Sequence, residues 1–179
     1  VFGGGGQVPY TEFDSPSPET VYGKSKLAGE NFIREFCNRH IIIRSSWIFG
    51  DKSLYLESIL KLASEGKTVK AAVDQIASPT GAAGLAEKVK ELMEYGEDGL
   101  YHVTGQGFCT RYEFAKEIAS LAGLDVTIQK VPHEQSDFSA VRPVNAVLNN
   151  FILSLTDIYD FPEWKDSLKK YLKEIGEIA

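Results

Sequence analysis

The sequence is poor in the residues that build metal centres and disulfide frameworks. Its 179 residues include two cysteines, Cys37 and Cys109, and three histidines. Neither cysteine belongs to a CxxC pair or stands beside a histidine, so we expect neither a structural zinc site nor a disulfide. Long apolar runs are missing as well. A membrane-spanning helix needs roughly 18 or more apolar residues and no signal peptide is recognisable, so we expect a cytoplasmic protein with no membrane partner.

Positive charge is also scarce. The chain has 19 Lys and Arg against 25 Asp and Glu, which gives a formal net charge of -6. Because binding to a phosphate backbone needs basic patches, we expect no nucleic-acid partner. A small anionic ligand is not excluded, since it needs only a local cluster of donors. Repeats are missing too, and the only low-complexity segment is the glycine run at residues 3–6.

What the sequence does contain is an alternation of helical and strand patterns. With 43% hydrophobic residues the chain can bury a core as one domain or two small ones. The β-branched start of the segment 41–49 predicts a parallel strand covered on both faces. The alternation predicts an α/β fold. The patterns place helices over 20–37, 54–65, 82–95, 111–122, 149–155 and 162–176, and strands over 41–49, 69–73, 99–104 and 125–131.

Two helix starts carry capping signals. Thr20 precedes the first helix and is a suitable N-cap residue. Thr110 and Glu113 have the spacing of a capping box at the start of the helix over 111–122. We therefore expect these two helix starts to be held by their own side chains.

The first helix opens with a Tyr-x-x-x-Lys pattern, in which Tyr22 and Lys26 lie on one helix face. A nearby ammonium favours the phenolate over the phenol, which makes Tyr22 a better proton donor to an alkoxide. That proton is needed when a hydride reduces a ketone. The alternative is a solvated pair one turn apart, which is common on surface helices.

Five segments give this pattern its context: residues 10–16 (YTEFDSP), 21–30 (VYGKSKLAGE), 44–50 (RSSWIFG), 74–80 (DQIASPT) and 142–145 (RPVN). In this order and spacing they resemble the dTDP-4-dehydrorhamnose reductase family of extended short-chain dehydrogenase/reductases. The resemblance covers residues 1–172. It implies part of a Rossmann-like NAD(P)-binding fold, with residues 1–50 as its end, and a small α/β substrate-binding lobe that makes up most of residues 51–179.

The resemblance also implies a reaction and its catalytic groups. The family reduces the 4-keto group of a dTDP-sugar with NADPH, although NADH remains an alternative because residues outside this sequence choose between them. Tyr22 would protonate the carbonyl oxygen. Lys26 would lower the pKa of Tyr22 and hold the nicotinamide ribose. Ser45 and Ser46 would border the cofactor. This chemistry needs no metal.

Four further residues would bind the sugar nucleotide. Trp47 would pack on the sugar, or it is simply a core aromatic. Gln75 and Ser78 lie in a polar loop that either contacts the ligand or only connects a strand to a helix capped by Thr80. The guanidinium of Arg142 suits a diphosphate, and its alternative is a surface ion pair with Glu134 or Asp137.

The sequence also departs from the family. Family members begin with a Rossmann half that carries a glycine-rich turn, whereas this sequence begins at Val1, just past the family's catalytic Ser/Thr. The run at residues 3–6 lacks the G-x-G-x-x-G arrangement. We therefore expect the C-terminal portion of a longer reductase, with a homodimer left open.

Other functions also fit the sequence. One is another extended short-chain enzyme, an epimerase or dehydratase acting on a nucleotide-sugar. The other is a non-catalytic subunit that resembles the regulatory β subunit of methionine adenosyltransferase. The intact Tyr22 and Lys26 pair favours an enzyme. Of the histidines, His102 is predicted to be a packed sheet residue and His133 a solvated one.

Overall fold

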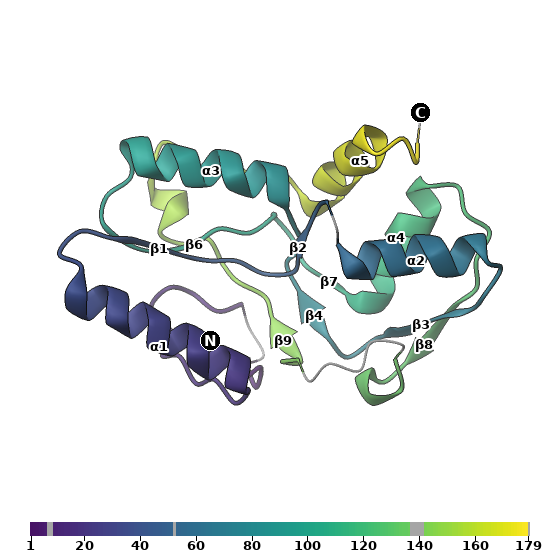
Figure 1. The fold of residues 1–179 in the computed structure, drawn as a ribbon, viewed down its shortest axis with the longest axis horizontal. Coiled ribbons are helices and arrows are strands. Elements are labelled where there is room, and N and C mark those ends of the chain that lie inside the picture. Colours follow the sequence, from purple (N-terminus) through teal and green to yellow (C-terminus); the bar gives the residue numbers. More distant parts are fainter. Residues whose placement is uncertain (7–8, 52, 137–141, 179) are drawn as a thin grey trace.

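The computed structural model describes residues 1–6, 9–51, 53–136 and 142–178. It confirms an α/β fold in which helices pack around short, mostly parallel strand pairs (Figure 1). The helices are α1 (Val21–Phe36), α2 (Leu54–Ser64), α3 (Ala82–Tyr95), α4 (Arg111–Leu121) and α5 (Trp164–Glu174), with 3₁₀ turns η1 (His133–Gln135) and η2 (Leu153–Leu155). The strands are β1 (Ile41–Arg44), β2 (Ile48–Phe49), β3 (Val69–Ala72), β4 (Ile76–Ala77), β5 (Thr80–Gly81), β6 (Gly99–His102), β7 (Cys109–Thr110), β8 (Ile128–Val131) and β9 (Asn145–Ala146).

The strands form four small sheets. Three are parallel pairs, β1 with β6, β2 with β5 and β3 with β8. In the fourth, β4 lies between antiparallel β7 and parallel β9. The register places Arg44 opposite His102 at the carboxyl end of the first pair. Polar side chains at that end of parallel strands are well placed to meet a ligand.

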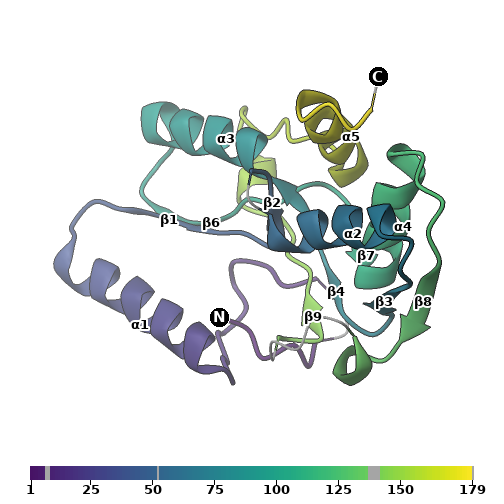
Figure 2. The same ribbon diagram turned by 45° about the vertical axis from the view of Figure 1, so that its right-hand side comes forward.

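Two hydrophobic cores stabilise the arrangement. The larger one lies between α2, α4 and α5 and contains the buried rings of Phe49, Phe114 and Trp164. The smaller one joins α3 and β6 to the segment after β9, through Leu92 and Tyr101. In Figures 1 and 2, α1 and α3 lie on opposite sides of the β1–β6 pair, away from the larger core. The part of the chain that carries the Tyr-x-x-x-Lys pattern is therefore separate from the larger core.

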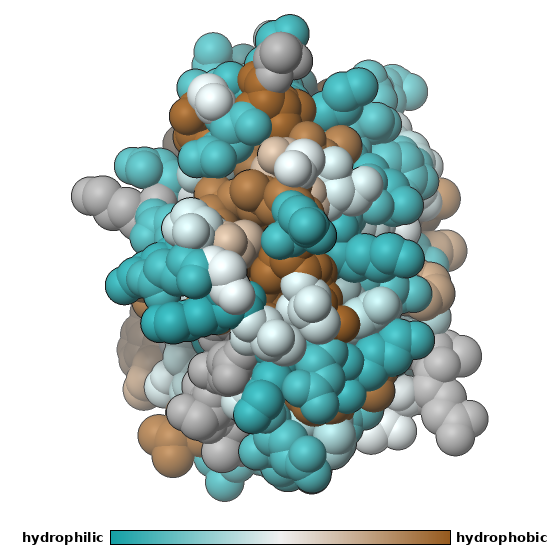
Figure 3. All heavy atoms as spheres, turned by 90° about the vertical axis from the view of Figure 1, so that its right-hand side faces the viewer, coloured by the Kyte–Doolittle hydropathy of each residue, from teal (hydrophilic) through white to brown (hydrophobic). Residues whose placement is uncertain are grey.

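Figure 3 shows the end of the molecule that carries α2, α4 and α5. Its surface is mostly hydrophilic, with apolar side chains gathered in a band down the middle. Such a distribution is expected where amphipathic helices turn their apolar stripes toward one another. None of the described helices combines the length and the apolarity that crossing a membrane requires.

Both predicted helix caps are confirmed. The Thr20 hydroxyl accepts a hydrogen bond from the backbone N–H of Gly23 at 3.0 Å. Thr110 and Glu113 form the reciprocal capping box, in which each side chain accepts from the other residue's backbone N–H. These signals are local in sequence, which is why they can be read without the fold.

Three predicted elements are wrong in detail. The strand expected over 41–49 is two strands, broken at Trp47, whose φ of 35° lies outside the extended region. The helix expected over 149–155 is only the 3₁₀ turn η2. The helix α3 is capped by Gly81 rather than by Thr80, which pairs in β5. In each case tertiary contacts override the local pattern.

His102 is a packed sheet residue, as predicted. Its side chain is 0% exposed, and Nδ1 lies 3.2 Å from the carbonyl oxygens of both Tyr10 and Asn149. The neighbouring Glu12 carboxylate accepts hydrogen bonds from the backbone N–H groups of His102 and Ile152. Burial lowers the pKa of His102, although the charge of Glu12 opposes this shift. Folding therefore favours the neutral form of this imidazole over the charged form.

This burial predicts a pH dependence of stability. His102 takes up a proton near its ordinary pKa of 6.5 when unfolded, but only at lower pH when folded. Its contribution is therefore complete above that value and is lost as pH falls through it. We expect the free energy of unfolding, measured by denaturant titration, to fall less steeply with acidification in His102→Asn than in the natural chain. His133 affects both proteins equally, so equal slopes would contradict the expectation.

Candidate active site

The helix α1 presents Tyr22 and Lys26 on one face. Lys26 Nζ lies 5.5 Å from the centroid of the Tyr22 ring, and the Tyr22 side chain is exposed. The Thr20 cap fixes the start of the helix one residue before Val21 and thereby sets which face Tyr22 occupies. The predicted pair is thus formed in space as well as in sequence.

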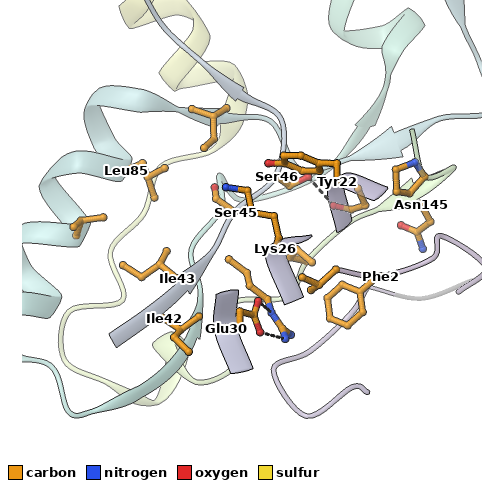
Figure 4. Close-up of a pocket in the computed structure, with 17 residues that line it drawn as sticks. Phe2, Tyr22, Lys26, Glu30, Ile42, Ile43, Ser45, Ser46, Leu85 and Asn145 are labelled. Carbon is orange, nitrogen blue, oxygen red and sulfur yellow. Dashed lines mark hydrogen bonds and ion pairs between the residues drawn. The ribbon is translucent and has the colours of Figure 1, made fainter. Parts of the chain in front are cut away.

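Both side chains line a cavity of about 420 Å³ (Figure 4). One wall comes from α1, another from β1 and the two serines that follow it, and a third from Leu85 of α3. Asn145 of β9 and Phe2 complete the lining that Figure 4 labels. The structure therefore brings together the four residues predicted to be catalytic or cofactor-binding: Tyr22, Lys26, Ser45 and Ser46.

The two serines differ in their bonding. The Ser46 hydroxyl donates to the carbonyl oxygen of Ala146 at 2.7 Å and so ties the end of β1 to β9. The Ser45 hydroxyl is buried and has no hydrogen-bond partner among the described residues. A buried hydroxyl without a partner is costly. Ser45 is therefore one group in this cavity whose hydrogen bonding a polar ligand could complete.

Beneath Lys26 lies a buried ion pair that joins α1 to β1. Glu30 accepts two hydrogen bonds from Arg44, from Nε at 2.8 Å and from Nη2 at 2.7 Å, and a third from Arg34 at 2.9 Å. The Arg44 guanidinium also lies 5.1 Å from the Phe2 ring centroid. Burial raises the pKa of Glu30, but the hydrogen bonds and charges of the two arginines outweigh it and hold the pKa below its usual value.

Trp47 lies outside the main cavity. It packs against the larger core, with its ring centroid 6.5 Å from that of Phe114, yet part of its surface stays exposed. The Arg111 guanidinium lies 3.6 Å from the centroid of the Trp47 ring. The indole is thus a core aromatic on one side, while its contact with a sugar stays a prediction.

The other predicted substrate residues do not form one cluster with the Tyr22 cavity. Gln75 is buried, and its carbonyl oxygen accepts a hydrogen bond from the Arg111 backbone at 3.2 Å. Ser78 is buried beside a second cavity of about 260 Å³ that Asn150 also lines. Arg142 is exposed. Their ligand contacts stay predictions.

The alternative role of Arg142, a surface ion pair with Glu134 or Asp137, is corrected for Glu134. No ion pair joins Arg142 to Glu134 in the described ranges, and Asp137 lies outside them. Glu134 instead approaches His133, with 3.6 Å between Oε1 and Nε2.

His133 is not simply solvated, as the sequence suggested. Its Nδ1 lies 2.9 Å from Asp74 Oδ2, and its backbone N–H donates to Asp74 Oδ1 at 2.9 Å. The hydrogen bond that the His133 ring donates to the Asp74 carboxylate raises the pKa of His133. Asp74, His133 and Glu134 place ligand atoms within 4.8 Å of one another. The two ion pairs account for this grouping, and we assign no metal to it.

Sequence reasoning missed Arg111. Its guanidinium lies close to two aromatic rings, 3.6 Å from the centroid of Trp47 and 4.4 Å from that of Tyr55. In the sequence it is one arginine after a helix cap, which is typical of a surface residue. Only the folding of α4 against the β1–β2 connection reveals the contact.

The family profile of the RmlD substrate binding domain matches residues 1–177. The chain belongs to this family. A Bacillus subtilis relative, the spore coat polysaccharide biosynthesis protein SpsK, is 39% identical over 97% of the chain and 61% of its own length. The predicted family membership is therefore confirmed.

Solved structures agree with this assignment to the RmlD substrate binding domain. A dTDP-4-dehydrorhamnose reductase from Clostridium acetobutylicum superposes with a TM-score of 0.93 at 36% identity, over 98% of this chain and 62% of that one. The reductase from Bacillus anthracis in complex with NADP gives 0.90 at 34%, over 97% and 62%. The predicted Rossmann-like α/β fold is confirmed. The chain spans about three fifths of the length of these relatives.

Proposed function

We propose that this RmlD substrate binding domain forms part of an NADPH-dependent dTDP-4-dehydrorhamnose reductase. The observation that carries the proposal is the cavity in which Tyr22, Lys26 and the unpartnered Ser45 hydroxyl meet. It is supported by relatives that bear this name, one of them in complex with NADP. An acidic chain of this kind would act on a dTDP-sugar in the cytoplasm, and a homodimer is compatible with the proposal.

The residues present fit the nicotinamide end of the cofactor. The Ser45 hydroxyl has no hydrogen-bond partner within the described ranges, and Lys26 offers an ammonium on the same cavity. When bound, the reduced nicotinamide supplies the hydride that a ketone accepts. Lys26 would hold the ribose hydroxyls. Ser46, whose hydroxyl is bonded to the Ala146 carbonyl of β9, would border the nicotinamide ring.

Tyr22 would donate its phenolic proton to the C4 oxygen of the sugar as the hydride arrives. Its ring stands at the mouth of the cavity on α1, where a carbonyl can reach it. The Lys26 ammonium lies 5.5 Å from the ring centroid and would stabilise the phenolate that forms when Tyr22 gives up its proton. Residues 1–50 would thus form the part of the site that binds the cofactor.

Residues 51–179 would form most of the substrate-binding lobe. There Gln75, Ser78 and Arg142 would bind the sugar nucleotide, together with Trp47 from the β1–β2 connection. Trp47 contacts Arg111 and the core but stays partly exposed, and a sugar would reach it at that exposed part. Of these four residues, Arg142 is the exposed one that can reach a charged group without desolvation.

A reduction assay on the intact natural protein tests the proposal. We expect saturable oxidation of NADPH that depends on dTDP-4-dehydrorhamnose and yields dTDP-L-rhamnose. A product with no net NADPH oxidation would instead indicate an epimerase or dehydratase. Absence of both NADPH binding and turnover, with capture of a synthetase partner, would indicate the regulatory-subunit alternative and overturn the proposal.

A further inference from the structure

Arg111 is the first residue of α4. Its guanidinium stacks on Trp47 at 3.6 Å and lies 4.4 Å from the Tyr55 ring centroid. Stacking of this kind engages the flat faces of the guanidinium and leaves its N–H groups around the edge. No ion pair between Arg111 and a carboxylate occurs in the part of the chain that the structure describes. Among the described residues, the guanidinium therefore contacts aromatic rings and has no carboxylate as a counter-charge.

The charge environment of Arg111 is unfavourable for a cation. Burial lowers the pKa of Arg111 to about 10, and the like charge of Arg142 acts in the same direction. Two guanidinium groups thus affect one another at a place where no described carboxylate balances them. An anion bound here would supply a counter-charge to the partly buried guanidinium of Arg111.

Two hydrogen bonds hold the backbone of Arg111 and so fix the point from which its side chain extends. Its N–H donates to the carbonyl oxygen of Gln75 at 3.2 Å, and its own carbonyl oxygen accepts from the Tyr55 hydroxyl at 2.9 Å. The stacked rings limit the side chain as well. A preorganised guanidinium loses less conformational entropy when it binds a ligand than a free surface arginine does.

We propose that Arg111 is a substrate-positioning residue, which together with Arg142 binds the diphosphate of the sugar nucleotide beside Trp47. This inference rests on the proposed function for the identity of the ligand. Guanidinium groups match the paired oxygens of a phosphate through two parallel hydrogen bonds. Two arginines from separate segments, α4 and the connection before β9, can each take one phosphate. Gln75, bonded to the Arg111 backbone, adds an uncharged donor at the same place.

Calorimetric titration with two probes, dTDP and inorganic pyrophosphate, tests this assignment on the intact protein. We expect Arg111→Gln to bind both probes about 10- to 100-fold more weakly, because it loses charge-assisted hydrogen bonds. Arg111→Lys should recover part of the affinity by restoring the charge. The matched control is Arg39→Gln, which removes an arginine that is 86% exposed and paired with Asp98, and should leave affinity unchanged.

A second variant keeps the test decisive if Arg111→Gln folds poorly. Arg142 is exposed, so Arg142→Gln removes the partner charge without disturbing a core, and a similar loss is expected. The salt dependence of dTDP binding should also become shallower in either variant, which loss of packing alone would not cause. Unchanged affinity and salt dependence for both probes would overturn the inference.

The outcome is separable from that of the proposed function. Binding of dTDP and pyrophosphate requires neither NADPH nor turnover, so a protein without reductase activity can still show the Arg111 effect. Conversely, a working reductase whose affinity for dTDP ignores Arg111 would disprove only this inference.

Discussion

Replacing Tyr22 with phenylalanine is expected to lower turnover of the intact protein by about 10²- to 10⁴-fold, the usual contribution of a positioned general acid. The substitution removes only the phenolic hydroxyl. The ring remains, so the contact between it and Lys26 is preserved and α1 keeps its Thr20 cap. Steady-state kinetics with NADPH and the keto sugar would show the loss in kcat rather than in KM, because the proton is needed only as the alkoxide forms.

A matched control exists on α3. Tyr95 is 74% exposed and Tyr22 is 72% exposed, so Tyr95→Phe removes a hydroxyl of similar exposure away from the cavity. We expect that variant to turn over normally. Retention of kcat in Tyr22→Phe would disprove the assigned role of the phenol and leave the exposed pair as a solvated surface feature.

Replacing Glu30 with glutamine is expected to lower the free energy of unfolding by about 3–5 kcal/mol, since breaking a buried pair leaves its partner uncompensated. Arg44 is 7% exposed and has no other carboxylate among the described residues. Its Nη1 is already buried and has no hydrogen-bond partner in the part of the chain that the structure describes. Denaturant titration at neutral pH would measure the loss.

The same pair predicts an acid limit. The pKa of Glu30 is lowered from its ordinary value of 4.5 in the folded state. Its contribution is therefore present above that pH and is lost as pH falls through the lower folded value. We expect the natural protein to lose this stability on acidification while Glu30→Gln shows no such loss.

Glu65→Gln is the control for a surface ion pair. Glu65 pairs with Lys67 at 2.7 Å, but both side chains are largely exposed. Surface pairs of this kind contribute about 0–1 kcal/mol. Equal effects of the two substitutions would contradict the view that burial, rather than distance, makes the Glu30–Arg44 pair important.

The sequence predicts those parts of the fold that depend on near neighbours. The Thr20 cap and the capping box of Thr110 and Glu113 involve residues three positions apart, so their patterns are visible in the chain. The Tyr22 and Lys26 pair is visible for the same reason. The family resemblance then places Ser45 and Ser46 beside that pair, and the cavity confirms that these residues meet.

The remainder depends on contacts between distant segments. The His133 and Asp74 pair joins residues 59 positions apart, and no local pattern marks it. The break of the strand at Trp47 follows from packing of the indole against α4 and not from any turn residue. The position of the Arg111 guanidinium likewise depends on its contact with the Trp47 ring. Such interactions become apparent only once the elements are placed in space.

The Glu30–Arg44 pair has a mechanical meaning beyond its stability. Arg44 is the residue directly before Ser45, and Glu30 lies one helical turn after Lys26, so one bidentate contact sets how far α1 stands from the carboxyl end of β1. The relative position of Tyr22 and Ser45 therefore depends on a carboxylate that touches neither of them. Protonation of Glu30 would release this contact, so the shape of the cavity itself is expected to depend on pH.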